Sequence, residues 1–279
     1  MTDLPAPAFE LPEELAIDTD AARRIIGEFI RAQLSQAGFG KVLLGLSGGI
    51  DSGLVAYLAA EAIGPQNVLA ILMPYKTSSP ESRGDAETIV KDLGLPHELV
   101  DISPIVDGYF DETRQDAAPL RRGNFMARAR MCVLYDHSVT WCGLVIGTGN
   151  KTEALIGYST LLGDSASAFN PIGDLYKSQV RQLSAAIGVP QAVINKAPSA
   201  DLWPGQTDED EVGFSYAEVD RILYRLVDRR LSLDEVVADG FERELVERID
   251  RMVAGSEFKR QVPPIAKIGP RTAGIDYLY

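Results

Sequence analysis

Short apolar runs that alternate with segments of helical length restrict the fold of this chain more than any other feature. Four such runs, KVLLGLS, VLAILMP, HELVDIS and GLVIGTG, occupy residues 41–47, 68–74, 97–103 and 143–149. Between the first three, apolar residues recur at helical spacing. These residues are Leu54, Leu58, Ala59 and Ala62, followed by Ala86, Ile89, Val90 and Leu93. The alternation predicts an α/β fold with a doubly wound, mostly parallel sheet that helices flank on both faces.

The second half of the chain is predicted to be mainly helical. A long helix is expected over residues 124–142 and another over 176–187, where Gly188 and Pro190 end it. Two or three amphipathic helices follow, near 215–230, 232–239 and 242–254, before a tail that begins at Val262. Residues 197–213 are rich in proline, glycine and acids, which predicts a mobile, functional loop. We expect one domain, 1–279, with a helical C-terminal part over 214–279.

Composition removes several classes of function. A net charge of −13 argues against a broad nucleic-acid surface, which would need clustered Lys and Arg. No apolar run approaches the roughly 20 residues that cross a bilayer, and the acidic, Pro-rich N-terminus does not read as a signal peptide. We therefore expect a cytoplasmic protein without a membrane anchor. Cys132 and Cys142 lack CxxC or His-rich spacing, which favours reduced structural thiols over zinc ligands or a disulfide.

The hexapeptide Ser47-Gly48-Gly49-Ile50-Asp51-Ser52 directly follows the first predicted strand and opens a helix. Its two glycines let the backbone turn sharply near a phosphate, and the helix N-terminus supplies free N–H groups and a positive dipole. The hydroxyls of Ser47 and Ser52 add donors. An ordinary turn with Asp51 or Ser52 as N-cap is the alternative interpretation. The absence of GxxxxGK[ST] and of GxGxxG disfavours a Walker-type or Rossmann site.

A second polar segment, Gly147-Thr148-Gly149-Asn150-Lys151-Thr152-Glu153, follows the fourth predicted strand. Asn150 and Glu153 have the spacing of a helix capping box, which alone would explain both. Neighbouring parallel strands would nevertheless bring Asp51 and Glu153 to the same edge of the sheet, where ligands of such sheets bind. Two hard carboxylates beside a triphosphate suit Mg²⁺.

Taken together, these motifs resemble a known family. SGGIDS resembles the PP-loop of the N-type ATP pyrophosphatases, and GTGNKTE is similar to the second block of the NAD synthetase family within that superfamily. Further similar segments are Gly157-Tyr158, Gly163-Asp164, PIGDLYK at 171–177, KAPSADL at 196–202, DEDE at 208–211 and Lys259-Arg260. The resemblance covers residues 41–260 and implies an adenine nucleotide alpha hydrolase-like fold.

The resemblance also implies roles for particular residues. Asp51 and Glu153 would bind magnesium, and the catalytic group would be Asp51, Lys177 and Asp164. The residues implied to bind ATP are Ser47, Gly48, Gly49, Ser52, Arg130, Thr148, Lys177 and Ser199. Those implied to bind the pyridine-nucleotide substrate are Asn124, Arg128, Tyr158, Asp164 and Lys259. Each has a plainer alternative: Arg128 and Arg130 as solvated helix charges, Lys177 at a helix start, and Tyr158 as a core residue.

As a whole, the resemblance implies a ligase that uses ATP and Mg²⁺ to amidate deamido-NAD with ammonia through an adenylated carboxylate. It further implies a homodimer. Because the similar segment occupies nearly the whole chain, we expect free ammonia as the nitrogen donor. Two departures are Phe258, where the family often has histidine, and Asp201, where small residues are frequent. The competing functions are another PP-loop ligase, GMP-synthetase-like or tRNA-modifying, and a non-catalytic adenine-nucleotide sensor.

Overall fold

The computed structural model describes residues 11–110, 117–199 and 213–272, and the structural statements below concern these residues. Its strands are β1 (Val42–Gly45), β2 (Val68–Leu72), β3 (His97–Leu99) and β4 (Leu144–Val145). Its helices are α1 (Thr19–Ala37), α2 (Ile50–Ile63), α3 (Pro80–Leu93), α4 (Ser103–Tyr109), α5 (Pro119–Trp141), α6 (Lys151–Ile156), α7 (Lys177–Ile187), α8 (Gln191–Asn195), α10 (Tyr216–Leu223), α11 (Leu233–Ala238) and α12 (Arg243–Gly255). Short helical turns are η1 (Glu13–Leu15), η2 (Pro65–Asn67), η4 (Tyr224–Asp228, a π turn) and η5 (Glu257–Arg260).

The four strands form one parallel sheet in the order β3-β2-β1-β4. Val42 at the start of β1 pairs with Val68 of β2 on one side and with Leu144 of β4 on the other. The chain winds outward from β1 to β3 and then returns to the opposite side of β1. The order therefore reverses between β1 and β4, the point where open α/β sheets bind ligands. The predicted parallel sheet is confirmed, with strands shorter than the apolar runs.

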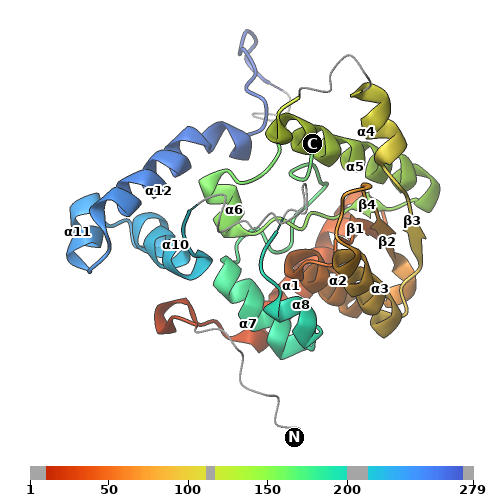
Figure 1. Ribbon diagram of the computed structural model, residues 1–279, viewed down its shortest axis with the longest axis horizontal. Helices are drawn as coiled ribbons and strands as arrows, with labels where there is room; N and C mark the ends of the chain where they lie inside the picture. Colours follow the sequence, from red (N-terminus) through yellow and green to blue (C-terminus); the bar gives the residue numbers. More distant parts are fainter. Residues whose placement is uncertain (1–10, 111–116, 200–212, 273–279) are drawn as a thin grey trace, which may run out of the picture.

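Helices cover both faces of this sheet, as the sequence predicts (Figure 1). Alternate β1 residues face opposite sides: Val42 and Leu44 pack in the cluster that α1, α2 and α7 share, whereas Leu43 packs with residues of α4 and α5. α2 differs from the expected one-sided helix, because every residue from Ser52 to Ala60 is buried. It lies between the sheet, α1, α3 and α7, so it has no solvent-facing side there.

The C-terminal helices form a third apolar cluster beside the sheet. α10, α11 and α12 pack around Val219, Ile222 and Ile249, and η1 adds Leu15 from the other end of the chain. These helices lie where amphipathic helices are predicted, near 215–230, 232–239 and 242–254. α5 begins at Pro119, earlier than the predicted Asn124, and residues 200–212 of the predicted mobile loop lie outside the described residues. Among the described helices, none is long and apolar enough to cross a membrane.

Cys132 and Cys142 are both free. Both are exposed, however, so the expectation that they serve as structural thiols is not met. α5 carries Cys132, and Cys142 follows its last residue with a left-handed backbone, φ 54°.

The turn between β1 and α2 brings two backbones unusually close. Gly48 has a φ of 80°, and a Cβ at this position would lie 2.0 Å from the carbonyl oxygen of Ser82 in α3. Only glycine satisfies both the left-handed conformation and this approach. Gly49 is the N-cap of α2 with φ −86°, so the interpretation that Asp51 or Ser52 caps this helix is wrong.

The η1 turn is attached to α10 by an ionic contact. The carboxylate of Glu14 accepts hydrogen bonds from Arg221 Nε at 2.9 Å and Arg225 Nη1 at 3.1 Å. Burial alone would raise the pKa of Glu14, but the hydrogen bonds from these two arginines outweigh it and lower the pKa from 4.5 to about 2. The contact therefore joins the N-terminal segment to the C-terminal helices through a charge that persists into acid.

We expect Gly48→Ala to destabilise the protein by more than about 2 kcal/mol, since left-handed strain adds to a steric clash with backbone. The free energy of unfolding in urea measures this. Gly49→Ala is the matched control. The φ of Gly49 is ordinary, and the atom nearest to a Cβ at this position would be Ser47 Oγ at 3.3 Å. Equal stability of the two variants would contradict the role assigned to Gly48.

We expect Glu14→Gln to lower the free energy of unfolding by roughly 1 kcal/mol at pH 7, the upper range for part-exposed pairs. Because the folded pKa is depressed, the stabilisation is present above the ordinary value of 4.5 and is lost as pH falls toward about 2. The difference between the two proteins should therefore shrink between pH 5 and pH 3. Glu13→Gln, at the exposed neighbouring residue, serves as the control. A pH-independent difference would count against the ionic contact.

Candidate active site

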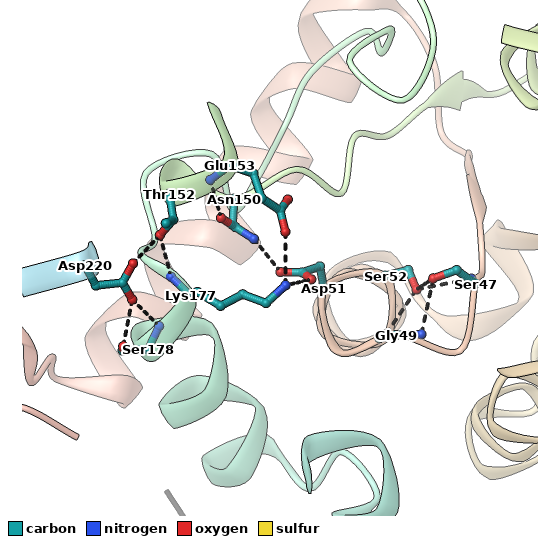
Figure 2. A network of polar contacts seen from close by, with 10 residues as sticks. All are labelled: Ser47, Gly49, Asp51, Ser52, Asn150, Thr152, Glu153, Lys177, Ser178 and Asp220. Atoms are coloured by element: carbon teal, nitrogen blue, oxygen red, sulfur yellow. Dashed lines mark hydrogen bonds and ion pairs between the residues drawn. The ribbon is translucent and has the colours of Figure 1, made fainter. Parts of the chain in front are cut away.

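A buried lysine lies where the sheet order reverses. Lys177, the first residue of α7, is only 2% exposed. Its ammonium donates to Asp51 Oδ2 at 2.5 Å and to Glu153 Oε1 at 3.0 Å. Asp51 belongs to α2 and Glu153 to α6, so three helices contribute one charged group each (Figure 2). This contact confirms that the ends of β1 and β4 bring the two carboxylates together.

The charges of this group fix its protonation. Burial alone would lower the pKa of Lys177, but the negative charges of Asp51 and Glu153 outweigh burial and raise its pKa above the ordinary value. Lys177 therefore carries a positive charge at every physiological pH. A fixed positive charge in contact with Asp51 of the phosphate loop can offset negative charge that develops on a nearby substrate.

The phosphate loop is held by its own hydroxyl groups. Ser52 Oγ accepts from Ser47 N at 3.2 Å and donates to the carbonyl of Gly49 at 3.1 Å. Ser47 Oγ lies 3.1 Å from Ser52 Oγ and accepts from Gly49 N at 3.2 Å. The loop thus has a defined shape ahead of a helix N-terminus that favours anions. Ser52 is buried and Ser47 is exposed, so Ser47 is the hydroxyl that faces solvent.

Asn150 connects the phosphate loop to α6. Its Oδ1 accepts from Glu153 N at 3.0 Å, which is one half of the predicted capping box. Its Nδ2 donates to Asp51 Oδ1 at 2.9 Å. The capping interpretation and the functional interpretation of this segment are therefore compatible, because the same side chain caps α6 and orients Asp51.

The donor set of this site fits magnesium. Mg²⁺ is commonly held by one or two carboxylates together with phosphate oxygens and water, and Asp51 and Glu153 supply two such hard ligands. Within the described ranges no group of three or more His, Cys, Asp or Glu residues could hold a metal by itself. Any magnesium here would therefore take its remaining ligands from the substrate and water.

Residues predicted to contact the pyridine nucleotide meet at Thr160. The backbone N–H of Thr160 donates to Asp164 Oδ1 at 2.8 Å, and its hydroxyl donates to Asn124 Oδ1 at 2.7 Å. One turn further along α5, Arg128 Nη2 donates to the carbonyl of Leu161 at 3.1 Å. The structure thus brings α5 against the loop after α6. Thr160 belongs to no motif, so the sequence offered no signal for it.

Lys259 lies at the other end of this loop. Its ammonium donates to the carbonyls of Gly157 at 2.7 Å and Ser159 at 2.8 Å, on either side of half-buried Tyr158. Tyr158 packs at the margin of the C-terminal cluster. Phe258, at the position of the family histidine, is 60% exposed. Lys259 therefore shapes the loop that carries Tyr158, whatever contact it makes with substrate.

Two of the remaining predicted ATP residues, Arg130 and Thr148, lie at the carboxyl ends of strands. Arg130 Nε donates to the carbonyl of Met73 at 3.1 Å, just after β2. Thr148 occupies the turn between β4 and α6, and Ser199 is exposed immediately before residues 200–212. Their contacts with ATP stay predictions, as do those of the other residues proposed for ligand binding.

A buried network behind Lys177 escaped sequence analysis. Asp220 of α10 accepts from Thr152 Oγ1 at 2.5 Å and from both the N–H and the hydroxyl of Ser178 at 2.7 Å (Figure 2). Thr152 Oγ1 in turn accepts from Lys177 N at 3.0 Å. In the sequence Asp220 is one acid of an amphipathic helix, which normally indicates a solvated position.

Comparison with known proteins agrees with this geometry. The family model for NAD synthase matches residues 23–263 of the chain. The NH(3)-dependent NAD(+) synthetase of Trichlorobacter lovleyi is 56% identical over 265 residues, which are 95% of this chain and 97% of that protein.

Solved structures show the same fold over most of the chain. NMN synthetase from Francisella tularensis superposes with a TM-score of 0.80 at 30% identity, covering 91% of this chain and 100% of that one. NH3-dependent NAD synthetase from Campylobacter jejuni, in complex with the nitrate ion, gives 0.77 at 34% identity, covering 90% and 100%. With the family model matching most of its residues, the chain belongs to the NAD synthase family.

Proposed function

We propose that this protein catalyses the ATP-dependent amidation of deamido-NAD to NAD with ammonia, releasing AMP and pyrophosphate. The observation that carries the proposal is the buried Lys177 ammonium between Asp51 and Glu153, beside a glycine-rich loop at a helix N-terminus. Such a site places fixed positive charge and hard oxygen ligands where a triphosphate would lie. A relative 56% identical to this chain is named NH(3)-dependent NAD(+) synthetase, which supports ammonia as the nitrogen donor and NAD as the product.

In the proposed first step a nicotinate carboxylate oxygen attacks the α-phosphorus of ATP. A new O–P bond forms, and the bond between the α-phosphorus and the oxygen that bridges it to the β-phosphate breaks. Pyrophosphate leaves with the electron pair of that bond. Lys177 offsets the charge that builds up on the phosphates, and the loop from Ser47 to Ser52 holds them by backbone N–H groups and the exposed Ser47 hydroxyl. The catalysis is positional and electrostatic, without a covalent enzyme intermediate.

In the proposed second step ammonia attacks the carbonyl carbon of the adenylated substrate. The C–N bond forms, the C–O bond to AMP breaks, and the nitrogen gives up a proton. Asp164, whose carboxylate is oriented by the N–H of Thr160, is assigned the position beside this nitrogen. Asn124, Arg128, Tyr158 and Lys259 are assigned to the dinucleotide, and Arg130, Thr148 and Ser199 to ATP.

Magnesium would be held by Asp51 and Glu153. When bound, it neutralises charge on the phosphate oxygens and orients them. Asn150 keeps the Asp51 carboxylate in place through its 2.9 Å hydrogen bond, and Lys177 separates the two carboxylates and limits their repulsion. These protein contacts fix the positions of the Asp51 and Glu153 carboxylates before any substrate binds.

The test is the formation of NAD, AMP and pyrophosphate from deamido-NAD, MgATP and ammonium. We expect all three products in equal amounts, and a loss of roughly 10²-fold or more with Asp51→Asn, because a charged ligand becomes a neutral amide. Glutamine in place of ammonium should support little product. Circular dichroism and the unfolding midpoint check that the variant is folded.

Other outcomes would redirect the assignment. Cleavage of ATP only with another acceptor, such as nicotinate mononucleotide or a purine nucleotide, would keep the adenylating site and change the substrate. The mononucleotide is included because one structural neighbour carries the name NMN synthetase. Binding of ATP without cleavage would favour the non-catalytic nucleotide sensor.

The assembly and location belong to the same proposal. We assign one catalytic unit to residues 1–279, acting as a homodimer in the cytoplasm, where ATP and pyridine nucleotides are available. α5, which carries Asn124 and Arg128, has exposed apolar side chains that suit such an interface: Leu120, Tyr135 and Val139.

We expect sedimentation velocity to give twice the chain mass of 30.3 kDa. Val139 is 75% exposed in the single chain and is assigned to the interface. Val139→Glu should therefore shift the protein toward the monomer, because the dimer would have to bury the new charge. Ile268→Glu, at a 97% exposed residue of the tail, is the matched control. A monomeric wild-type protein at micromolar concentration would refute the assembly.

A further inference from the structure

Asp220 is a fully buried carboxylate that the reaction itself does not use. It is 0% exposed, and three donors from two other helices converge on it. Thr152 belongs to α6 and Ser178 to α7, whereas Asp220 belongs to α10. The carboxylate therefore joins the two helices that carry Glu153 and Lys177, and each of those residues is an immediate chain neighbour of one of its partners.

The network ends at the start of α7. Lys177 and Ser178 are the first two residues of this helix, whose early N–H groups have no partner within the helix. Lys177 N–H donates to Thr152 Oγ1 at 3.0 Å, and the Thr152 hydroxyl donates to Asp220 Oδ1 at 2.5 Å. Ser178 N–H donates to Asp220 directly. A negative charge beside a helix N-terminus is also favoured by the helix dipole.

α10 contacts the Lys177 side chain as well. Tyr216 precedes Asp220 by one helical turn and lies on the same face. The Lys177 ammonium lies 5.1 Å from the centre of the Tyr216 ring, within the range of a cation–π contact. One face of α10 thus contacts the Lys177 ammonium directly and is connected to the Lys177 N–H through Thr152.

Apolar packing would suffice if α10 only had to cover its neighbours. Val219 and Ile222 already provide such packing, and both are fully buried. Burial disfavours the charge of Asp220 and raises its pKa, a cost that hydrogen bonds must offset. Unlike apolar contacts, the hydrogen bonds of this carboxylate are directional, so they set the separation of α6 and α7.

We infer that Asp220 is a positioning residue that, through Thr152 and Ser178, sets the spacing of α6 and α7 and thereby holds the Lys177 ammonium between Asp51 and Glu153. The inference rests on the proposed adenylation at this site. No described contact joins Asp220 to Asp51 or Glu153, so its effect on the reaction passes through the placement of α6 and α7.

Asp220→Asn is the direct test. Both carboxylate oxygens face donors, Thr152 Oγ1 on one side and Ser178 N on the other, so an amide NH₂ opposes a donor in either orientation. We expect kcat for pyrophosphate release to fall roughly 10- to 100-fold through misplacement of Lys177. The ratio kcat/KM for ammonium should be unchanged, because ammonia enters after adenylation, so KM for ammonium should fall together with kcat.

Thr152 supplies an independent pair of variants. Thr152→Ser keeps the hydroxyl that connects Lys177 N to Asp220, and should retain kcat within about threefold. Thr152→Val has nearly the same shape without the hydroxyl, and should show the fall in kcat expected of Asp220→Asn. This pair decides the question if Asp220→Asn does not fold.

A stability-matched control separates positioning from general destabilisation. Ile222→Val removes one buried methylene from the same helix without touching the network. At a temperature where both proteins are folded by circular dichroism, it should keep wild-type kcat while Asp220→Asn does not. Wild-type kcat in Asp220→Asn, or equal activity of Thr152→Ser and Thr152→Val, would overturn the inference. Failure of the wild-type protein to release pyrophosphate with any acceptor would instead refute the proposed function.

Discussion

The contact between the Lys177 ammonium and the carboxylates of Asp51 and Glu153 is the interaction on which the rest of this site depends. A buried ammonium without partners would lose its proton or unfold the segment that carries it. Two carboxylates without the ammonium would repel each other at the edge of the sheet. The two carboxylates therefore make the burial of Lys177 possible, and the three helices that carry these charges must be placed together.

The sheet order explains how chain segments so far apart can meet. Lys177 lies 126 residues from Asp51 and 24 from Glu153. Adjacent parallel strands end at the same edge, so β1 delivers the phosphate loop and β4 delivers α6 to neighbouring positions. α2 then holds Asp51 firmly, because it is buried on every side over most of its length. Helices therefore carry the three charges, whereas Tyr158 and Asp164, two of the residues assigned to the dinucleotide, lie on the loop after α6.

The parts of the fold that could be predicted are those encoded by local pattern. The apolar runs and the glycines of the phosphate loop have strong signals, and the placement of Asp51 and Glu153 at one edge follows from a parallel sheet. α2 could not be read as fully buried, because periodicity does not report what covers the second face of a helix. Asp220 and Thr160 were missed for a related reason. Their roles come from partners 68 and 36 residues away, and nothing in their local sequence distinguishes them from solvated polar residues.

Asn150 caps α6 and orients Asp51, a combination that no other capping residue could provide. Its carbonyl oxygen caps α6 at Glu153 N while its amide nitrogen donates to Asp51. Because a backbone N–H only donates and a carboxylate only accepts, the orientation of this amide is determined by its partners. Asp, Ser and Thr cap helices comparably well, yet Asp would place a third negative charge at the site, and Ser or Thr would not span both partners. The identity of a helix cap is thus dictated by the charge of a residue on another helix, so a substitution that is neutral for the helix would still disturb the magnesium ligand proposed here.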